Sequence, residues 1–204
     1  MRYETDVVVI GAGGGGMAAA LSAYKSGADV ILIEREDETG GVLNQCIHNG
    51  FGLHYYKKDL TGPEFKETLQ EELERTNVRV LKGTFVLDVS RDKRITFVNS
   101  NGIHEIKTKA LVMTTGARER HFNSLGIPGD RVSGIFTAGV AQKYINLQNL
   151  KPANSALIVG SGDIGLIMAR RLHLEGIEVK GVVEILPYPG GLERNVQQCL
   201  RDYD

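Results

Sequence analysis

The sequence predicts an α/β fold, in which a parallel β-sheet is covered by helices, followed by the start of a second unit of the same kind. Two observations carry this prediction. Short apolar runs alternate with helix-forming segments, which is typical of successive βαβ units. A glycine pattern in the first unit also recurs, in the same context, 149 residues further along the chain. A chain of 204 residues can bury two small cores of this type.

The first unit opens with an apolar run, residues 7–10, which predicts a strand buried on both faces. Gly11, Gly13 and Gly16 follow it in the spacing G-x-G-x-x-G. In a strand-to-helix turn the first glycine allows the tight turn, the second lets the backbone approach a pyrophosphate, and the third lets helix and strand pack closely. The phosphates then lie on the N–H groups at the start of the helix.

Residues 17–26 favour a helix, and Gly27 is placed to end it. A second apolar run, Val30–Ile33, predicts the neighbouring strand, and Glu34 follows it directly. An acid at this distance from the glycines accepts hydrogen bonds from a ribose. The order of these parts predicts a Rossmann-like unit that binds a dinucleotide.

The second copy of the glycine pattern consists of Gly160, Gly162 and Gly165. It lies between an apolar run, residues 156–159, and a helix-forming stretch, and residues 177–185 predict the next strand. Glu184 then falls within one residue of the position that matches Glu34. A single pattern is weak evidence in a chain with 25 glycines, because it can arise in any flexible loop. Two copies in the same context predict two dinucleotide sites, or the beginnings of two.

Composition and charge exclude several classes of protein. The net charge of −1 argues against a nucleic-acid or anionic-membrane partner. The first residues form no secretory signal, and no apolar run approaches the roughly 20 residues that span a bilayer. We therefore expect a cytoplasmic protein without a transmembrane segment. Cys46 and Cys199 are the only cysteines and lie far apart, which excludes a disulfide framework and a zinc ribbon, so no metal site is expected.

The segment after the first unit's acid combines a glycine-rich stretch with a helix. Residues 40–52 show no period of helix or strand, and such a polar segment is where the far end of a bound cofactor would be enclosed. Thr61 and Glu64 have the spacing of a capping box. Apolar residues at four-residue intervals then predict a helix as far as about Arg75.

Four short alternating segments follow, at residues 78–81, 84–89, 95–98 and 103–106. They predict an antiparallel β-meander, about residues 78–107, inserted into the first domain, with Asn101 and Gly102 as a hairpin turn. Residues 110–114 return to the sheet. Thr115 and Gly116 therefore lie at the carboxyl end of a strand, where ligands of open α/β sheets bind.

These elements predict the domain organisation. Residues 1–117 form the first domain, residues 118–151 a crossover or linker with one helix at about 137–148, and residues 152–204 the beginning of the second domain, which ends in a helix at 192–204. Only the strand–helix–strand start of that second domain is present. We therefore expect the chain to be a fragment of a longer protein.

Several of these motifs together resemble one family. The paired glycine patterns, Gly40-Gly41, Thr115-Gly116 and residues 127–129 are similar to those of the pyridine nucleotide–disulfide oxidoreductase superfamily, flavoproteins with two dinucleotide-binding domains. The resemblance runs over essentially the whole chain. Residues 40–52 and 114–120 resemble FAD/NAD oxidoreductases associated with anaerobic glycerol-3-phosphate dehydrogenases and, more distantly, sarcosine oxidase alpha subunits. The resemblance implies FAD in the first domain and NAD(P)H in the second.

The resemblance also implies which residues touch the cofactors. For FAD these are Gly11, Gly13, Gly16, Glu34, Arg35, Gly41, Val42, Val86, Thr115 and Gly116. For the nicotinamide dinucleotide they are Gly160, Gly162, Asp163, Ile164 and Glu184. Glu184 suits a free 2′-hydroxyl and would repel a 2′-phosphate, and the next arginine, Arg194, is ten residues away. NAD(H) is therefore favoured over NADP.

One departure from the family pattern concerns the redox dithiol. Disulfide reductases of the superfamily carry two cysteines with four residues between them shortly after the double glycine, and Leu43 and His48 occupy those places here. Cys46 between them is either a small apolar filler or a thiol that faces the flavin. His48 is either a proton donor near the flavin or a structural histidine. No redox disulfide can form in this segment.

The expected function is hydride transfer between NAD(P)H and FAD without a dithiol relay, in the service of a dehydrogenase or oxidase partner subunit, and the full-length protein is expected to be an oligomer. Two alternatives stay open. The protein could be a flavin dehydrogenase or oxidase subunit that acts on a small substrate such as an amine or glycerol phosphate. It could also be a subunit that binds a dinucleotide without turnover.

Overall fold

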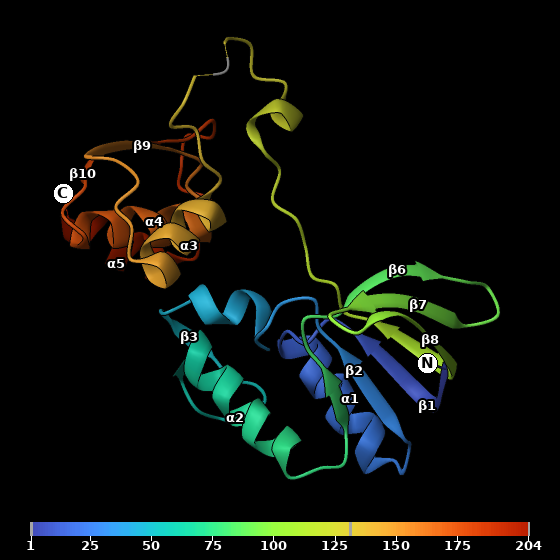
Figure 1. Cartoon of the computed structure of the whole chain (residues 1–204). Coiled ribbons are helices and arrows are strands. Elements are labelled where there is room, and N and C mark those ends of the chain that lie inside the picture. The colour runs from blue at the N-terminus through green and yellow to red at the C-terminus, as the bar shows by residue number, and fades with distance from the viewer. Residues whose placement is uncertain (1, 131, 204) are drawn as a thin grey trace. The chain divides into compact units, whose positions relative to one another are not determined.

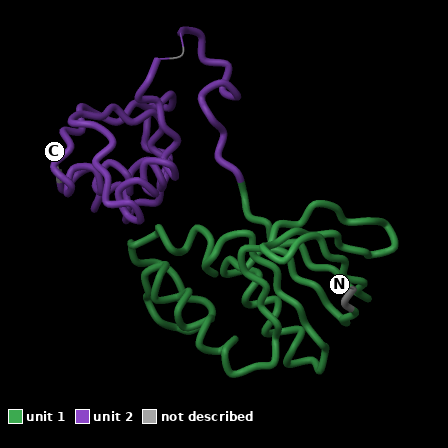
Figure 2. Tube along the Cα trace, viewed as in Figure 1, with its two compact units in different colours: residues 1–117 green, residues 118–204 purple. Residues whose placement is uncertain are grey.

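The computed structural model describes residues 2–130 and 132–203, and Figure 1 shows the arrangement of their helices and strands. The chain divides into two compact units, Met1–Ala117 and Arg118–Asp204, which Figure 2 colours separately. The first unit contains the larger sheet, and the second contains a parallel pair of strands. Each unit has its own clusters of buried apolar side chains.

A six-stranded sheet forms the centre of the first unit, in the order β5-β2-β1-β8-β7-β6. Its strands are β1 (Arg2–Ile10), β2 (Val30–Ile33), β5 (Arg79–Leu81), β6 (Phe85–Val89), β7 (Arg94–Asn99) and β8 (Gly102–Met113). In that order, the strands from β5 to β8 are parallel to their neighbours, whereas β8, β7 and β6 pair antiparallel. The predicted α/β class is confirmed.

The two faces of this sheet bury different side chains, and the α-helices of the first unit pack against one of the two faces (Figure 1). The helices of the unit are α1 (Gly14–Lys25) and α2 (Gly62–Glu74). Because successive strand residues point to opposite faces, Val8 and Val9 of β1 belong to different clusters. Val9 packs with Met17 of α1 and Leu69 of α2, while Val8 packs with Phe97 of β7. β2 is apolar throughout because both of its faces are buried.

The capping box that begins α2 is confirmed. The N–H of Thr61 donates to Glu64 Oε2 over 2.7 Å, and the N–H of Glu64 donates to Thr61 Oγ1 over 3.4 Å. The two residues satisfy backbone groups that the helix itself cannot. They set where α2 starts.

The prediction of a four-segment meander was wrong in its first segment. β5 pairs in parallel with β2, with Leu32 opposite Val80, and is the outer strand of the parallel part. The reason is topological, because β5 follows α2, and a strand that returns through a helix enters a sheet parallel to the previous strand. The antiparallel meander consists of β6, β7 and β8.

The two segments predicted at 103–106 and 110–114 are one strand. β8 pairs antiparallel with β7 from Gly102 to Lys107 and parallel with β1 as far as Met113. The continuity was not apparent from the sequence because polar residues lie between the two segments. Thr108 shows how hydrogen bonds accommodate such a residue within the strand. Its Oγ1 donates to the carbonyl oxygens of Asp6 and Ala110 over 3.0 and 2.8 Å.

Short elements fill the glycine-rich segment that was expected to be irregular. They are the 3₁₀ helix η1 (Gly41–Gln45) and the paired strands β3 (Asn49–Phe51) and β4 (Leu60–Thr61). This stretch leads the chain from the end of β2 to α2.

The second unit is a small βαβ arrangement with additional helices. Its elements are η2 (Phe122–Leu125), α3 (Ala138–Gln148), β9 (Ser155–Val159), α4 (Asp163–Leu174), β10 (Glu178–Val183), α5 (Glu193–Cys199) and η3 (Arg201–Tyr203). The helix expected at 137–148 is confirmed as α3. The helix expected at 192–204 ends at Cys199, and η3 follows it. Asp204, the end of the expected helix, lies outside the described residues.

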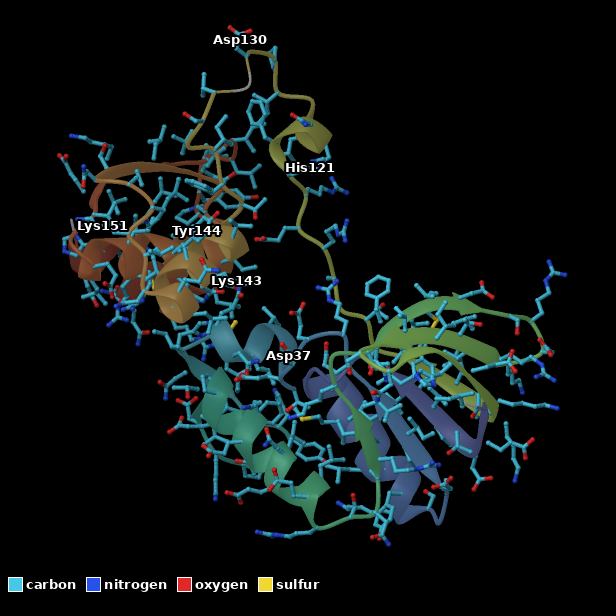
Figure 3. The ribbon with its side chains drawn as sticks, viewed as in Figure 1. Asp37, His121, Asp130, Lys143, Tyr144 and Lys151 are labelled. Atoms are coloured by element: carbon cyan, nitrogen blue, oxygen red, sulfur yellow. The ribbon has the colours of Figure 1, made fainter. Side chains whose placement is uncertain are left out.

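The core of the second unit lies between its helices and its strands. Ile145 of α3 packs with Met168 and Leu172 of α4. Lys151, labelled in Figure 3, donates its Nζ to the carbonyl oxygen of Gly176 over 2.7 Å and so ties the segment before β9 to the end of α4. No helix within residues 2–130 and 132–203 is long and apolar enough to cross a membrane.

Candidate functional site

The glycine turn between β1 and α1 is held by backbone contacts that tolerate no side chain. At Gly11, where φ is 97°, a Cβ would overlap the carbonyl oxygen of Thr114. At Gly16 a Cβ would overlap the carbonyl oxygen of Gly11. The first and third glycines are therefore required by the fold itself, as the fingerprint predicts.

Thr114 completes this turn and was not among the predicted site residues. Its Oγ1 lies 2.9 Å from the carbonyl oxygen of Ile10 and 2.8 Å from that of Gly11, to which it donates. The end of β8 is thereby attached to the turn. A hydroxyl residue directly before Thr115 was the sequence signal that could have identified it.

The double glycine lies directly against the first turn. The N–H of Gly40 donates to the carbonyl oxygen of Ala12 over 2.8 Å, and Gly13 and Gly40 form a parallel bridge. A Cβ on Gly41 would lie 3.5 Å from Gly13 Cα. Val42, the next predicted site residue, is 64% exposed. Two segments far apart in the sequence thus line one glycine-rich surface.

Glu34 is buried at the end of β2, with 7% of its surface exposed. The N–H of Ala12 donates to its Oε2 over 2.7 Å, and the N–H of Glu36 donates to its Oε1 over 3.0 Å. These bonds fix the carboxylate beside the glycine turn, where it can accept a ribose hydroxyl. Arg35, by contrast, is exposed and donates its Nε to Glu36 Oε1 over 3.1 Å.

The remaining residues predicted for FAD lie on elements that reach the same turn. The N–H of Thr84 donates to the carbonyl oxygen of Glu34 over 2.9 Å, so β6, which carries Val86, begins beside the ribose acid. Val86 is half-buried and pairs with Phe97. Thr115 and Gly116 are exposed directly beyond β8.

Cys46 and His48 lie in the segment that leads to α2. The carbonyl oxygen of Cys46 accepts the N–H of Gly62 over 2.8 Å, and burial raises the pKa of its thiol. A protonated thiol is a poor nucleophile and a poor redox centre. The His48 ring lies 5.2 Å from that of Phe51, and its Nδ1 is 2.9 Å from the carbonyl oxygen of Asn49. These contacts support structural roles for both residues.

The second glycine turn reproduces the first. The N–H of Gly160 donates to the carbonyl oxygen of Val183 over 2.7 Å, just as that of Gly11 donates to Ile33 over 2.8 Å. A Cβ on Gly165 would overlap the carbonyl oxygen of Gly160. Both copies of the turn therefore have the same backbone geometry.

A β-bulge explains why Glu184 lies one residue out of register in the sequence. Val179 pairs with Ala156, but Gly181 pairs with Leu157, so Lys180 is an extra residue in β10. The bulge places Glu184 directly after the residue that pairs with the end of β9, which is the position of Glu34 relative to β1. The two acids are thus structurally equivalent.

The Glu184 carboxylate is held by several donors of the chain. They are the N–H groups of Ser161, Ile185 and Leu186, at 3.0, 2.8 and 3.1 Å, and the hydroxyl of Ser161. The hydrogen bond from the Ser161 hydroxyl is the largest influence on the carboxyl's pKa, and with the backbone bonds it lowers that pKa to about 2. Glu184 is therefore ionised at any physiological pH.

Ser161 and Asp163 also anchor the loop that follows β10. Ser161 Oγ accepts the N–H of Gly190 over 2.9 Å, and Asp163 Oδ1 accepts the N–H of Leu192 and the Nδ2 of Asn195, both over 2.7 Å. Asp163, predicted to line a pyrophosphate, thus uses one carboxylate oxygen to hold α5. Ser161 was missed because its partners are known only once the fold is formed.

Two further observations complete the second site. Ile164 is 59% exposed in the first turn of α4, next to the predicted phosphate position. Among the residues that the structure describes, no three His, Cys, Asp or Glu side chains are grouped as metal ligands would be.

Comparison with known proteins agrees with this geometry. The family model described as pyridine nucleotide-disulphide oxidoreductase matches residues 5–203. The chain is 28% identical to a subunit of opine oxidase from Agrobacterium tumefaciens (strain Ach5), over 96% of this chain and 40% of that one. It is also 28% identical to the alpha subunit of sarcosine oxidase from Rhizobium meliloti (strain 1021), over 97% of this chain and 20% of that one.

Among solved structures, bacillithiol disulfide reductase Bdr from Bacillus cereus superposes with a TM-score of 0.71 at 19% identity, over 96% of this chain and 63% of that one. This likeness concerns the fold. The chain spans less than half of the length of the two oxidase subunits. The predicted resemblance is confirmed, and the chain belongs to the pyridine nucleotide-disulphide oxidoreductase family, a family of FAD-binding oxidoreductases.

Proposed function

We propose that this chain binds FAD on its first unit and a nicotinamide dinucleotide on its second, and that the protein passes a hydride between NAD(P)H and the flavin. One observation carries the proposal. In both units the N–H of the residue between the first two glycines holds the acid that ends the next strand, from Ala12 to Glu34 over 2.7 Å and from Ser161 to Glu184 over 3.0 Å. Both turns are thus built in the same way for the adenosine end of a dinucleotide.

The second glycine of each turn supports a bound pyrophosphate. A Cβ on Gly13 would meet no atom closer than the Gly40 carbonyl oxygen at 3.9 Å, and a Cβ on Gly162 would meet no described atom within 4 Å. Their φ angles, −69° and −65°, suit any residue. Neither the backbone nor the packing of the chain demands glycine there, so the close approach of a ligand is the remaining reason for it.

The first unit suits FAD. The first turn of α1 contains no acidic residue, so a phosphate would meet no like charge there. Glu34 would accept the ribose hydroxyls, and the double glycine beside Gly13 would leave room for the pyrophosphate on its way to the flavin. Val42, Thr115 and Gly116 are exposed at the same end of the sheet and would line that path.

The second unit suits NAD(H) better than NADP(H). Glu184 is ionised, since its pKa is lowered to about 2, and it would repel a 2′-phosphate while accepting a hydrogen bond from a free 2′-hydroxyl. Gly160, Gly162, Asp163 and Ile164 would lie along the pyrophosphate, with one carboxylate oxygen of Asp163 occupied by its hydrogen bonds from Leu192 and Asn195.

Electrons would leave the flavin without passing through a dithiol. Leu43, at one of the two dithiol positions, is buried beside Phe65 and the start of α1. Cys46 has no cysteine within reach in this segment, because Cys199 is the only other one in the sequence. The flavin and nicotinamide rings supply the hydride chemistry when bound, and the residues of the chain bind and orient them.

The test is an anaerobic titration of the full-length protein. Purified protein should carry the absorption bands of an oxidised flavin, and NADH should bleach them at lower concentration than NADPH does. A protein that is colourless and does not take up added FAD would overturn the proposal. If neither NADH nor NADPH reduced the bound flavin, only the proposal that the first unit binds FAD would stand.

A second candidate function is that of one component of an oxidase or dehydrogenase for a small substrate. Two relatives favour this function, because they are named as subunits of opine oxidase and of sarcosine oxidase. In that case a partner protein would exchange electrons with the flavin. Reduction of the flavin by candidate amines, without NADH and only when the partner is present, would distinguish this function from the first.

A further inference from the structure

Glu34 and Glu184, which directly follow β2 and β10, differ in how many hydrogen bonds they accept from the chain itself. Glu34 accepts hydrogen bonds from two donors among the described residues, the N–H groups of Ala12 and Glu36. Glu184 accepts four, from the N–H groups of Ser161, Ile185 and Leu186 and from the hydroxyl of Ser161. An ionised carboxylate offers about four lone-pair positions. Glu34 therefore keeps acceptor positions for a ligand, whereas those of Glu184 are taken.

Only one of the four donors to Glu184 can give way. The three N–H groups are fixed by the backbone, but the Ser161 hydroxyl can turn about χ1. The corresponding residue in the first turn is Ala12, which has no hydroxyl. A ribose hydroxyl that approaches Glu184 must therefore replace the hydroxyl of Ser161, and nothing comparable opposes a ribose at Glu34.

We propose that the Ser161 hydroxyl is an internal stand-in for a ribose hydroxyl, which makes the second site a weaker, exchanging dinucleotide site than the first. This inference rests on the proposed function and goes beyond it, because it gives one hydroxyl group a part in how tightly the second site holds its nucleotide. Binding at Glu184 exchanges one hydrogen bond for another, so little affinity is gained from it.

The burial of Ser161 strengthens this competition. The residue is 3% exposed, so water cannot readily restore the hydrogen bond that its hydroxyl loses when a ligand displaces it. The second contact of the hydroxyl, as acceptor of the Gly190 N–H over 2.9 Å, involves an exposed glycine. Water can replace that contact if the hydroxyl is removed. Removing the hydroxyl should therefore act mainly by freeing Glu184.

The experiment is a calorimetric titration of the full-length protein with ADP-ribose, which carries the adenosine ribose but no nicotinamide ring. The Ser161→Ala variant should bind ADP-ribose about three- to tenfold more tightly than the wild type, the range expected for one competing hydrogen bond. Ser124→Ala is the matched control, because it removes an exposed hydroxyl of the same unit whose one partner among the described residues is the His121 carbonyl oxygen. Its affinity should equal that of the wild type.

A second arm tests whether the effect runs through the carboxylate. In a Glu184→Ala background there is no acceptor to compete for, so adding Ser161→Ala should leave the affinity unchanged. A Ser161→Ala protein that binds ADP-ribose as the wild type does, or more weakly, would overturn the inference while the proposed function stands. A wild type that binds neither ADP-ribose nor NADH would overturn the proposed function and this inference together.

Discussion

Gly15 and Gly16 are neighbours in the first turn of α1, yet a side chain would meet different surroundings at each. A Cβ on Gly16 would overlap the carbonyl oxygen of Gly11 and lie 2.7 Å from Thr114 Oγ1, whereas a Cβ on Gly15 would have Thr114 Cγ2 as its nearest neighbour, at 3.9 Å. Backbone atoms of the turn cannot move away as the end of a flexible side chain can. The fold therefore requires glycine only at the second of these positions.

This difference leads to a paired prediction. Gly16→Ala should lower the free energy of unfolding by about 3 kcal/mol or more, because helix and strand must separate to admit the methyl group. Gly15→Ala should raise it by about 0.5 to 1 kcal/mol, because alanine is the better helix former at an exposed position. Urea unfolding of both variants without added nucleotide measures this. Equal effects of the two substitutions would contradict the packing argument.

The ionisation of Glu184 predicts how stability depends on pH. In the folded state its pKa is lowered to about 2 from the ordinary 4.5, chiefly by the Ser161 hydroxyl. A group with a lowered folded-state pKa contributes stability above its unfolded pKa and loses it as the pH falls towards the folded value. The wild type should therefore lose stability relative to Glu184→Gln as the pH falls from 4.5 to 2. Urea unfolding of both proteins at a series of pH values measures this. If the difference between their free energies of unfolding stayed constant over this range, the prediction would be refuted.

The residues of the site were predictable from the sequence to different degrees. The glycines and the acids follow local rules of spacing, so Gly11 and Glu34 could be named from the pattern alone. Ser161 and Thr114 act through hydrogen bonds to residues 23 and 103 positions away, and such partners depend on how the strands are ordered. Spacing rules contain no information of that kind.

Local signals were sufficient for the helices, and α2 illustrates this. Its start follows from Thr61 and Glu64, whose reciprocal hydrogen bonds need no tertiary partner. The strands were harder, because pairing is not written in the strand itself. β5 was assigned to the meander because its alternation of apolar and polar residues matches that of its neighbours. The equivalence of β10 and β2 was not visible in the sequence because β10 contains an extra, bulged residue, Lys180.

The capping box supplies a prediction at the scale of one element. Thr61→Ala should lower the free energy of unfolding by about 1 kcal/mol, because it removes the acceptor for the N–H of Glu64. Thr68→Ala is the matched control, since among the described residues its hydroxyl donates only to the Glu64 carbonyl oxygen one turn earlier in α2, over 2.9 Å, and alanine favours helix there. Thermal unfolding should show a lower midpoint temperature for the Thr61 variant than for the Thr68 variant. A Thr61 variant as stable as the wild type would show that α2 is held by packing alone.

At the scale of the whole molecule, the two units present two versions of one glycine turn. Both turns share the backbone geometry and the acid. They differ between the first two glycines, where Ala12 corresponds to Ser161, and before the third glycine, where Gly14 and Gly15 correspond to Asp163 and Ile164. The sequence repeat predicted this organisation because each turn is a local structure. It could not predict that the chain would satisfy one acid more fully than the other, since that property belongs to the folded turns.

The independence of the two turns can be tested through their second glycines. Gly13→Ala and Gly162→Ala each place a methyl group where the chain has room, so neither should unfold the protein. Each methyl group would, however, meet a pyrophosphate. Gly13→Ala should therefore lower the affinity for FAD by at least about tenfold and leave the affinity for ADP-ribose unchanged. Gly162→Ala should lower the affinity for ADP-ribose to a similar extent and leave the affinity for FAD unchanged. Flavin content and calorimetry on the same preparations measure both. If either substitution abolished the binding of both FAD and ADP-ribose, the two glycine turns would not be separate sites. The assignment of one dinucleotide to each unit would then fail.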